Sequence, residues 1–199
     1  LGRVYMHQLK WDAAQAHLKK SLALAKEIPD YKYWLASISR LIHIAAKKNE
    51  FDRLNDFKDK LDECFKKVKN PDKNAEGIAY LGLARLAFLN NSHDNIPLIV
   101  DWLQKGIPNI VLYGSWARTD IKTRLNNIEE DFHKIDYNII NKVGQLMINF
   151  IKETEKQDIS YSTALEIMFK WANWKGDMQC STTSKPSEIV HIPSYEPSM

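Results

Sequence analysis

The chain has 199 residues, of which 44% are hydrophobic and 27% are charged, and both fractions are ordinary for a globular protein. The formal net charge is only +3 and the lysine pairs are scattered, which argues against the concentrated basic face of a dedicated nucleic-acid-binding protein. The two cysteines are too few and too far apart for a disulfide framework, so we expect a reducing, cytoplasmic setting.

No apolar run approaches the roughly 20 residues that a membrane-spanning helix requires, and no signal peptide is recognisable. With 7 glycines and 7 prolines, the sequence favours long helices over a turn-rich β fold. The helical pattern is already under way at Leu1, so we expect the given sequence to begin at a cut edge, with any upstream domain outside it.

Residues 1–30 predict the rear half of one helix, a tight turn at residues 9–12 and a complete second helix. Small residues at Gly2, Ala14 and Ser21 suggest that the two antiparallel helices pack closely. A lone helical hairpin cannot bury both of its faces, so this stretch predicts neighbours of the same kind.

The other helices are predicted from apolar residues at i, i+3, i+4 and i+7 spacing. The segments with this period are residues 31–48, 54–68, 75–89, 95–106, 121–132, 137–151 and 160–174. We expect helix caps at Asp30, Thr119-Asp120 and Asp136, and at a serine or threonine near the start of the last helix. Pro29 would end the second helix, and Pro108 would start a separate short helix.

Two short pairs recur along the chain. An aromatic–aspartate pair at residues 11–12 returns 40 residues later at residues 51–52, and the Leu-Gly pair at residues 1–2 returns after 80 residues at residues 81–82. Each aspartate is expected to accept hydrogen bonds from the first turn of the helix that it opens. A repeat period of about 40 residues is typical of helical solenoids.

The first repeat resembles the tetratricopeptide repeat. The residues that carry the resemblance are Leu1, Gly2, Tyr5, Ala14 and Leu18, with Ser21 in place of the usual alanine. The second unit has Ile42 for the glycine and Leu54 for the alanine, and the third has Arg85 for the aromatic residue. The resemblance covers residues up to about 106 and is compatible with the rest.

The resemblance implies an all-α fold, in which antiparallel helical hairpins stack as a right-handed α-solenoid over residues 1–175. Residues 176–199 are rich in Ser, Thr and Pro without a helical period, so we expect an extended or disordered tail. Similar long repeats occur in the C-terminal regions of bacterial signal-transduction ATPases and in peptide-sensing transcription regulators, where the array binds a partner.

The implied function is a non-enzymatic scaffold that binds a protein or peptide, as the sensor or assembly module of a larger bacterial regulatory protein. The alternative is the peptide-pheromone-binding domain of a transcription regulator. An enzyme with an unfamiliar helical active site is a third hypothesis, although no phosphate-binding glycine loop, clustered metal ligands or nucleophile–base pair occurs. The sequence therefore predicts no catalytic, cofactor or metal site.

By the same resemblance, the first helix of each hairpin lines a concave, partner-binding groove. The groove positions are Arg3, His7, Ser39, His43, Lys47, Glu76 and Leu83, together with Met6, Ala36, Ala79 and Ala87. Their donors and positive charges would bind a peptide carboxylate or an acidic segment. A hydrated surface with scattered charges is the alternative.

Other residues are expected to be structural. Cys64, Trp34 and Trp102 fit apolar helical stripes and are predicted core residues. Trp171 and Trp174 would cover the open end of the array or form a partner-binding patch. The acidic run at residues 129–131 is expected to be solvated.

Overall fold

In the computed structural model, the described residues are 1–28, 31–68, 70–111, 117–154 and 158–175, and every regular element within them is helical. The α-helices are α1 (Gly2–His7), α2 (Trp11–Glu27), α3 (Tyr31–Lys48), α4 (Leu54–Lys67), α5 (Lys73–Leu89), α6 (Ile96–Val111), α7 (Ala117–Glu129), α8 (Tyr137–Glu153) and α9 (Ile159–Ala172). The all-α prediction is confirmed. The expected tail at residues 176–199 lies outside the described residues. So do Pro29 and Asp30, which were predicted to end one helix and to cap the next.

Three short 3-10 helices precede longer ones. They are η1 (Phe51–Arg53) before α4, η2 (His93–Asn95) before α6 and η3 (Phe132–Lys134) before α8. None of the α-helices in the described part of the chain combines the length and apolarity needed to cross a bilayer.

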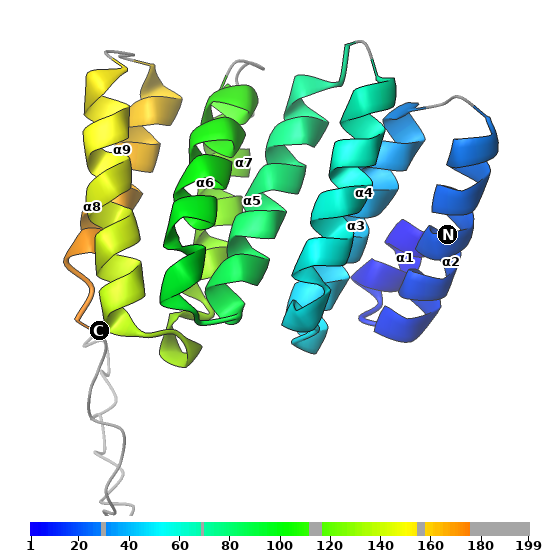
Figure 1. The fold of residues 1–199 in the computed structure, drawn as a ribbon, viewed down its shortest axis with the longest axis horizontal. Coiled ribbons are helices and arrows are strands. Elements are labelled where there is room, and N and C mark those ends of the chain that lie inside the picture. Colours follow the sequence, from blue (N-terminus) through cyan, green and yellow to red (C-terminus); the bar gives the residue numbers. More distant parts are fainter. Residues whose placement is uncertain (29–30, 69, 112–116, 155–157, 176–199) are drawn as a thin grey trace, which may run out of the picture.

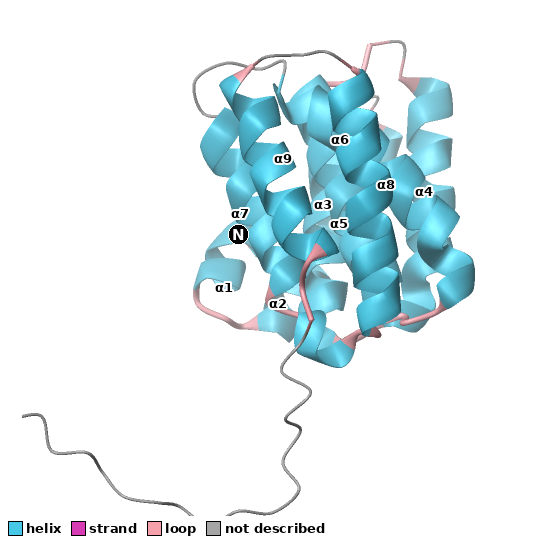
Figure 2. Cartoon of the chain, turned by 90° about the vertical axis from the view of Figure 1, so that its left-hand side faces the viewer, coloured by secondary structure: helices cyan, strands magenta, loops and turns pink. Residues whose placement is uncertain are grey.

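Helices that follow one another pack as antiparallel pairs, namely α1 with α2, α3 with α4, α5 with α6 and α8 with α9 (Figure 1). Contacts also link α3 to α5, α5 to α7, α7 to α9 and α6 to α8. Seen from one end, α1, α7 and α9 lie toward one side and α4 and α8 toward the other, with α3, α5 and α6 between them (Figure 2). The face formed by α3, α5 and α7 carries the site described below.

Helix α5 lies at the centre of this packing. The Asp72 side chain caps it by accepting hydrogen bonds from the N–H groups of Asn74 (3.0 Å) and Ala75 (3.1 Å). From Leu83 to Leu89 every residue is buried, so the helix has no solvent-facing stripe over this stretch. A helix that is apolar around its circumference needs neighbours on all sides, and α5 contacts α3, α4, α6 and α7.

Glycines allow close approach of the backbones within two helix pairs. A Cβ atom on Gly77 of α5 would lie 2.8 Å from the carbonyl oxygen of Gly106 in α6. A Cβ atom on Gly144 of α8 would lie 2.6 Å from the backbone nitrogen of Ala172 in α9. Both helix pairs therefore require the absence of a side chain at these positions.

The recurrent Leu-Gly pair does not occupy equivalent places. A Cβ atom on Gly2 would meet Leu18 of its own hairpin at 2.8 Å, whereas one on Gly82 would meet Ile42 of α3 at 2.9 Å. Gly77, rather than Gly82, lies against the second helix of the third hairpin. The two Leu-Gly pairs are therefore alike in sequence, but their glycines pack against different parts of the fold.

The prediction of a helix end at Gly106 and a new helix at Pro108 is wrong, because α6 continues to Val111 with Pro108 inside it. Proline lacks an N–H group and removes one hydrogen bond from the helix. Ile107 and Ile110, which are fully buried, anchor this last turn in the core and offset that loss.

The helix caps follow the predictions in part. Asp136 caps α8, as predicted, by accepting from the N–H of Asn138 at 2.7 Å. Helix α9 is capped by Asp158 instead of a serine or threonine. Helix α7 begins at Ala117, so Thr119 and Asp120 lie within its first turn and do not cap it.

The two repeated aspartates are not caps either. Lys10 precedes α2 without a side-chain cap, and Asp12 accepts a hydrogen bond from Lys48 Nζ at 2.9 Å. Asp52 is exposed within η1, where no side-chain cap hydrogen bond forms. The pair at residues 11–12 thus contributes a contact between hairpins.

The core predictions for Trp34, Trp102 and Cys64 are confirmed. Burial also raises the pKa of the Cys64 thiol to about 11. Trp171 is not part of an exposed patch: its side chain is fully buried, and its ring lies 5.9 Å from Phe88 of α5. Helix α9 is therefore attached directly to the central helix.

Candidate functional site

The predicted groove residues lie on three helices. Arg3 and His7 are exposed on α1, and Ser39, His43 and Lys47 lie on α3. Glu76 and Leu83 lie on α5, but neither reaches the face shared with α3 and α7: Glu76 accepts from Lys73 Nζ at 2.8 Å, and Leu83 is 1% exposed.

The groove assignment is therefore wrong for Leu83, whereas that of Glu76 stays a prediction. Ala79, Leu83 and Ala87 are core residues, all at most 1% exposed. The α5 residues that meet α3 and α7 around a common cavity include Ile78, Gly82 and Arg85. Because α5 is apolar on nearly every face, its amphipathic pattern is too weak to indicate which face is turned inward.

Five polar residues surround this cavity, and we call them the arginine cluster. They are Ser39 and His43 of α3, Arg85 of α5, and Arg124 and Asn127 of α7. Ala46, Ile78, Leu81 and Gly82 complete the walls. The cavity volume is about 20 Å³, which suffices for one water-sized group. Of the predicted groove residues, Ser39 and His43 are the two that the structure brings together here.

Arg85 is 4% exposed, and two carboxylates lie along one edge of its guanidinium group. Its Nε atom donates to Asp131 Oδ2 at 2.8 Å, and its Nη2 atom lies 4.0 Å from Glu130 Oε2. The remaining nitrogen, Nη1, is buried and has no hydrogen-bond partner among the described residues. The Nε and Nη2 side of the guanidinium group therefore faces carboxylates, whereas Nη1 has no acceptor among the described residues.

Asp131 corrects the expectation of a solvated acidic run. It is 6% exposed and accepts from both Arg85 and Lys134, the latter at 3.1 Å. Sequence reasoning missed this pair because its members are 46 residues apart. A signal was present, since Arg85 is the one charged residue in the otherwise apolar stretch 77–89.

Arg124 brings a second guanidinium group to the cavity. Its Nε atom is also buried without a partner among the described residues. Burial lowers the pKa of Arg124 most, Asp120 opposes that change, and the charges of Arg40 and Arg85 lower it further. The mutual repulsion shows that the arginines of this face lie close enough to raise its positive potential.

His43 does not supply the positive charge that the sequence suggested. Burial lowers its pKa to about 4, and the charges of Arg85, Arg124 and Lys47 add to the effect. At neutral pH the imidazole is uncharged, with one donor and one acceptor nitrogen. Lys47, in turn, lies 3.4 Å from Glu130, so this charge is shared with a carboxylate.

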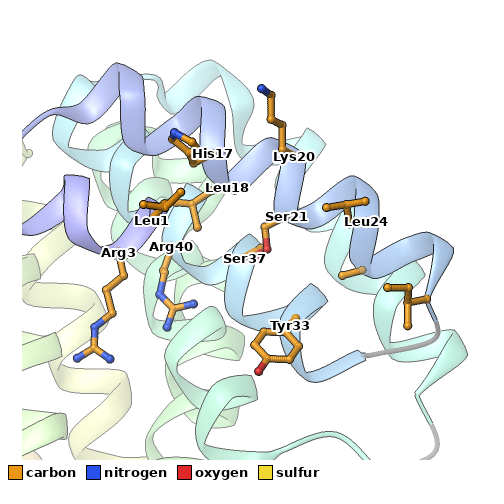
Figure 3. Close-up of a pocket in the computed structure, with 13 residues that line it drawn as sticks. Leu1, Arg3, His17, Leu18, Lys20, Ser21, Leu24, Tyr33, Ser37 and Arg40 are labelled. Carbon is orange, nitrogen blue, oxygen red and sulfur yellow. Dashed lines mark hydrogen bonds between the residues drawn. The ribbon is translucent and has the colours of Figure 1, made fainter.

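A larger cleft lies between α1, α2 and α3 (Figure 3). Arg3 and Arg40 line it. We call it the N-terminal cleft, and its volume is about 640 Å³. Leu24, Ile28 and Tyr33 are largely exposed along it. The Arg3 and Arg40 side chains extend to the same side, whereas Lys20 points away.

Arg40 connects the two features. Its Nη1 atom donates to the carbonyl oxygen of Ala36 at 3.2 Å, which holds the side chain along α3. Burial and the charge of Arg3 lower the pKa of Arg40, and Arg40 lowers that of Arg124. Positive charge therefore extends from the N-terminal cleft to the arginine cluster.

The described residues hold no group of three or more histidine, cysteine or carboxylate side chains that could bind a metal ion. The arrangement offers guanidinium donors next to apolar surface, which suits the recognition of oxyanions. Comparison with known proteins finds no matching family model, no similar curated protein and no similar solved structure. The tetratricopeptide resemblance therefore stays a prediction.

Proposed function

We propose that this chain is a non-enzymatic, tetratricopeptide-like solenoid that binds an acidic, partly apolar peptide segment of a partner protein. The observation that carries the proposal is the N-terminal cleft, where exposed Leu24, Ile28 and Tyr33 lie beside Arg3 and Arg40. Its volume of about 640 Å³ lies within the range of ligand-binding sites. Apolar anchors flanked by positive charge complement a peptide that carries both apolar and acidic side chains.

The helical framework also favours this function energetically. The cleft is lined by α1, α2 and α3, and α2 is tied to α3 by the hydrogen bond from Ser37 to Ser21 at 3.0 Å. A largely preformed surface lowers the ordering cost of binding, which then falls mainly on the peptide. In this proposal the chain is the sensor or assembly module of a larger bacterial regulatory protein.

One observation supports the alternative of a peptide-pheromone-binding domain in a transcription regulator. Lys47 near the end of α3 approaches Glu130, which follows α7, across the central helix α5. Such an approach is expected of a strongly curved array that encloses a short peptide. In that case a short free peptide would bind at least as tightly as the identical segment within a larger protein.

The test is a selection of short random peptides displayed on phage, followed by fluorescence anisotropy with the enriched sequences. We expect acidic peptides with apolar residues. Arg40→Glu and Leu24→Asn should each weaken binding by about tenfold or more, as for loss of one interfacial contact. Lys19→Glu, an exposed change outside the cleft lining, is the charge-matched control and should stay within about twofold. Equal affinity of all three variants, or a selection without enrichment, would reject the proposal.

A further inference from the structure

Two guanidinium groups in the arginine cluster, one on the buried Arg85 and one on the half-buried Arg124, carry buried nitrogen atoms without acceptors among the described residues. Arg85 Nη1 and Arg124 Nε both lack hydrogen-bond partners among the described residues, and Arg85 is 4% exposed. Buried polar groups are nearly always hydrogen-bonded, and a charged donor has the most to lose when it is not. Both residues line the same cavity, so one acceptor there could serve both.

The side chains around the cavity carry more positive than negative charge. Arg85, Lys47 and Lys134 share two carboxylates, Glu130 and Asp131. Arg124 adds another positive charge, which the nearby Asp120 offsets in part, and its Nε atom has no hydrogen-bond partner among the described residues. The neutral His43 and the amide of Asn127 add polar atoms to the wall without negative charge. The excess of positive charge therefore favours an anion as the ligand of this cavity.

The size and shape of the cavity select the kind of anion. A volume of about 20 Å³ accommodates one oxygen-sized group, and the walls include the apolar side chains of Ile78 and Leu81. A planar carboxylate can place one oxygen in this space and leave the rest outside. A tetrahedral phosphate that did the same would hold three further oxygens at the mouth of the cavity, where Ile78 and Leu81 offer them no hydrogen bonds. Guanidinium N–H groups also match the planar geometry of a carboxylate.

We infer that the arginine cluster is a carboxylate-binding subsite, in which Arg85 Nη1 and Arg124 Nε donate hydrogen bonds to one carboxylate group. The carboxylate belongs either to a small free acid or to the peptide of the proposed function. Only the peptide source rests on that function, since a free carboxylate needs nothing beyond the arginine cluster itself.

His43 provides the readout. Burial and, to a lesser extent, the positive charges of Arg85, Arg124 and Lys47 lower the pKa of His43 to about 4. A carboxylate bound between the two arginines offsets this repulsion and stabilises the imidazolium form. Binding should therefore raise the pKa of His43, which NMR follows through the ring protons, with His43→Gln used to assign the resonance.

The experiment titrates His43 in sodium formate and in sodium chloride at the same ionic strength. We expect formate to raise the pKa of His43 by about one unit more than chloride does, in a saturable manner. The melting temperature should rise over the same formate concentrations, because a ligand that binds the native state stabilises it. Equal effects of formate and chloride, or a larger effect of phosphate than of formate, would overturn the inference.

Two variants of α7 separate the site from general charge effects. Arg124→Gln removes one donor and should abolish the difference between formate and chloride. Arg118→Gln removes an exposed charge from the same helix and should preserve it. If Arg124→Gln responds to formate as the unmodified protein does, the assignment of the donors is wrong.

The source of the carboxylate is resolved with the peptides from the display selection. A peptide that raises the pKa of His43, and loses this effect when one carboxylate becomes an amide, supplies the carboxylate itself. Peptides that bind without affecting His43 assign the subsite to a free acid. If formate acts as expected and no peptide binds, the subsite stands and the proposed function fails.

Discussion

Asp131 and Arg85 form an ion pair that is buried between the central helix and the turn after α7, with exposures of 6% and 4%. Removing one partner of such a pair leaves an uncompensated charge in the core. We expect Asp131→Asn to lower the free energy of unfolding by about 3 kcal/mol, measured by urea denaturation. The amide keeps the size of the carboxylate, so the change in packing is small.

Glu130→Gln is the matched control for this prediction. Glu130 is next in the chain and lies 4.0 Å from the same guanidinium group, but its side chain is 57% exposed. Its loss should cost at most about 1 kcal/mol, as for an exposed ion pair. Comparable losses for both variants would show that the core does not depend on the charge of Asp131.

His43 predicts a pH dependence of stability. Its pKa is about 4 in the folded protein and 6.5 as the ordinary value, so the unfolded chain takes up the proton first as the pH falls. The free energy of unfolding should therefore decrease between pH 6.5 and pH 4, by on the order of 3 kcal/mol from this group.

Several carboxylates with lowered pKa values, such as Asp136, lose stabilising charge over lower pH ranges as well. The informative quantity is thus the difference between the unmodified protein and His43→Gln, measured by urea denaturation at several pH values. The variant should show a flatter dependence between pH 6.5 and pH 4. Parallel curves would mean that the folded protein accepts the proton at His43 without cost.

Single residues also show what a sequence can reveal. Trp34, Cys64 and the cap Asp136 were predictable, because periodicity and capping are local patterns. The partners of Asp131 were not, since a local run of three acidic residues gives no information about an arginine 46 positions upstream. Leu83 was misplaced for the opposite reason: its surroundings are so uniformly apolar that no face stands out.

At the scale of elements, the close contact between α8 and α9 is the most sensitive to added bulk. Gly144→Ala would place a Cβ atom 2.6 Å from the backbone nitrogen of Ala172, and backbone atoms cannot rotate away. We expect a loss of about 1–3 kcal/mol or more in the free energy of unfolding, despite the better helix propensity of alanine. Thermal and urea denaturation would measure it.

Gly82→Ala is the control for this substitution. Its Cβ atom would meet Ile42 Cγ2 at 2.9 Å, and an isoleucine side chain can shift by a few tenths of an ångström. Alanine also gains about 1 kcal/mol over glycine within a helix, so the net change should be close to zero. A loss at Gly82 as large as that at Gly144 would contradict the distinction between side-chain and backbone contacts.

Most helices were predictable as elements, because their apolar residues recur at helical spacing over several turns. The span from Tyr31 to Lys48 was predicted with the bounds that the structure has. The end of α6 was not, because glycine and proline signal a break only where tertiary contacts do not compensate. Gly106 is instead a close-packing position, and Ile107 and Ile110 anchor the turn that contains Pro108.

At the scale of the whole molecule, an aromatic contact joins helices that are distant in the chain. Trp171 of α9 packs its ring 5.9 Å from Phe88 of α5 and 5.1 Å from Phe132. In an ideal repeat array, each unit contacts only its neighbours and unfolding spreads from the ends. Here we expect α5 and α9 to unfold together.

Trp171→Ala tests this coupling. Truncation of a buried tryptophan should cost about 3–5 kcal/mol in the free energy of unfolding. Hydrogen exchange should show that protection falls in α5 as well as in α9. Phe51→Ala, at an aromatic residue that is 39% exposed, is the control and should leave exchange in both helices nearly unchanged. Loss of protection in α9 alone would contradict the coupling and show that α9 unfolds independently of α5.

The contacts of α5 with the turn after α7 and with α9 limit how this chain can be shortened. Excising the α5–α6 hairpin as a cassette would remove Arg85 and Phe88 at once, leaving Asp131 without its buried counter-charge and Trp171 without one aromatic partner. A duplicated copy of that hairpin would carry a second buried arginine for which the structure holds one Asp131. The unit suited to transplantation or recombination is therefore the block from α5 to α9, not the single hairpin.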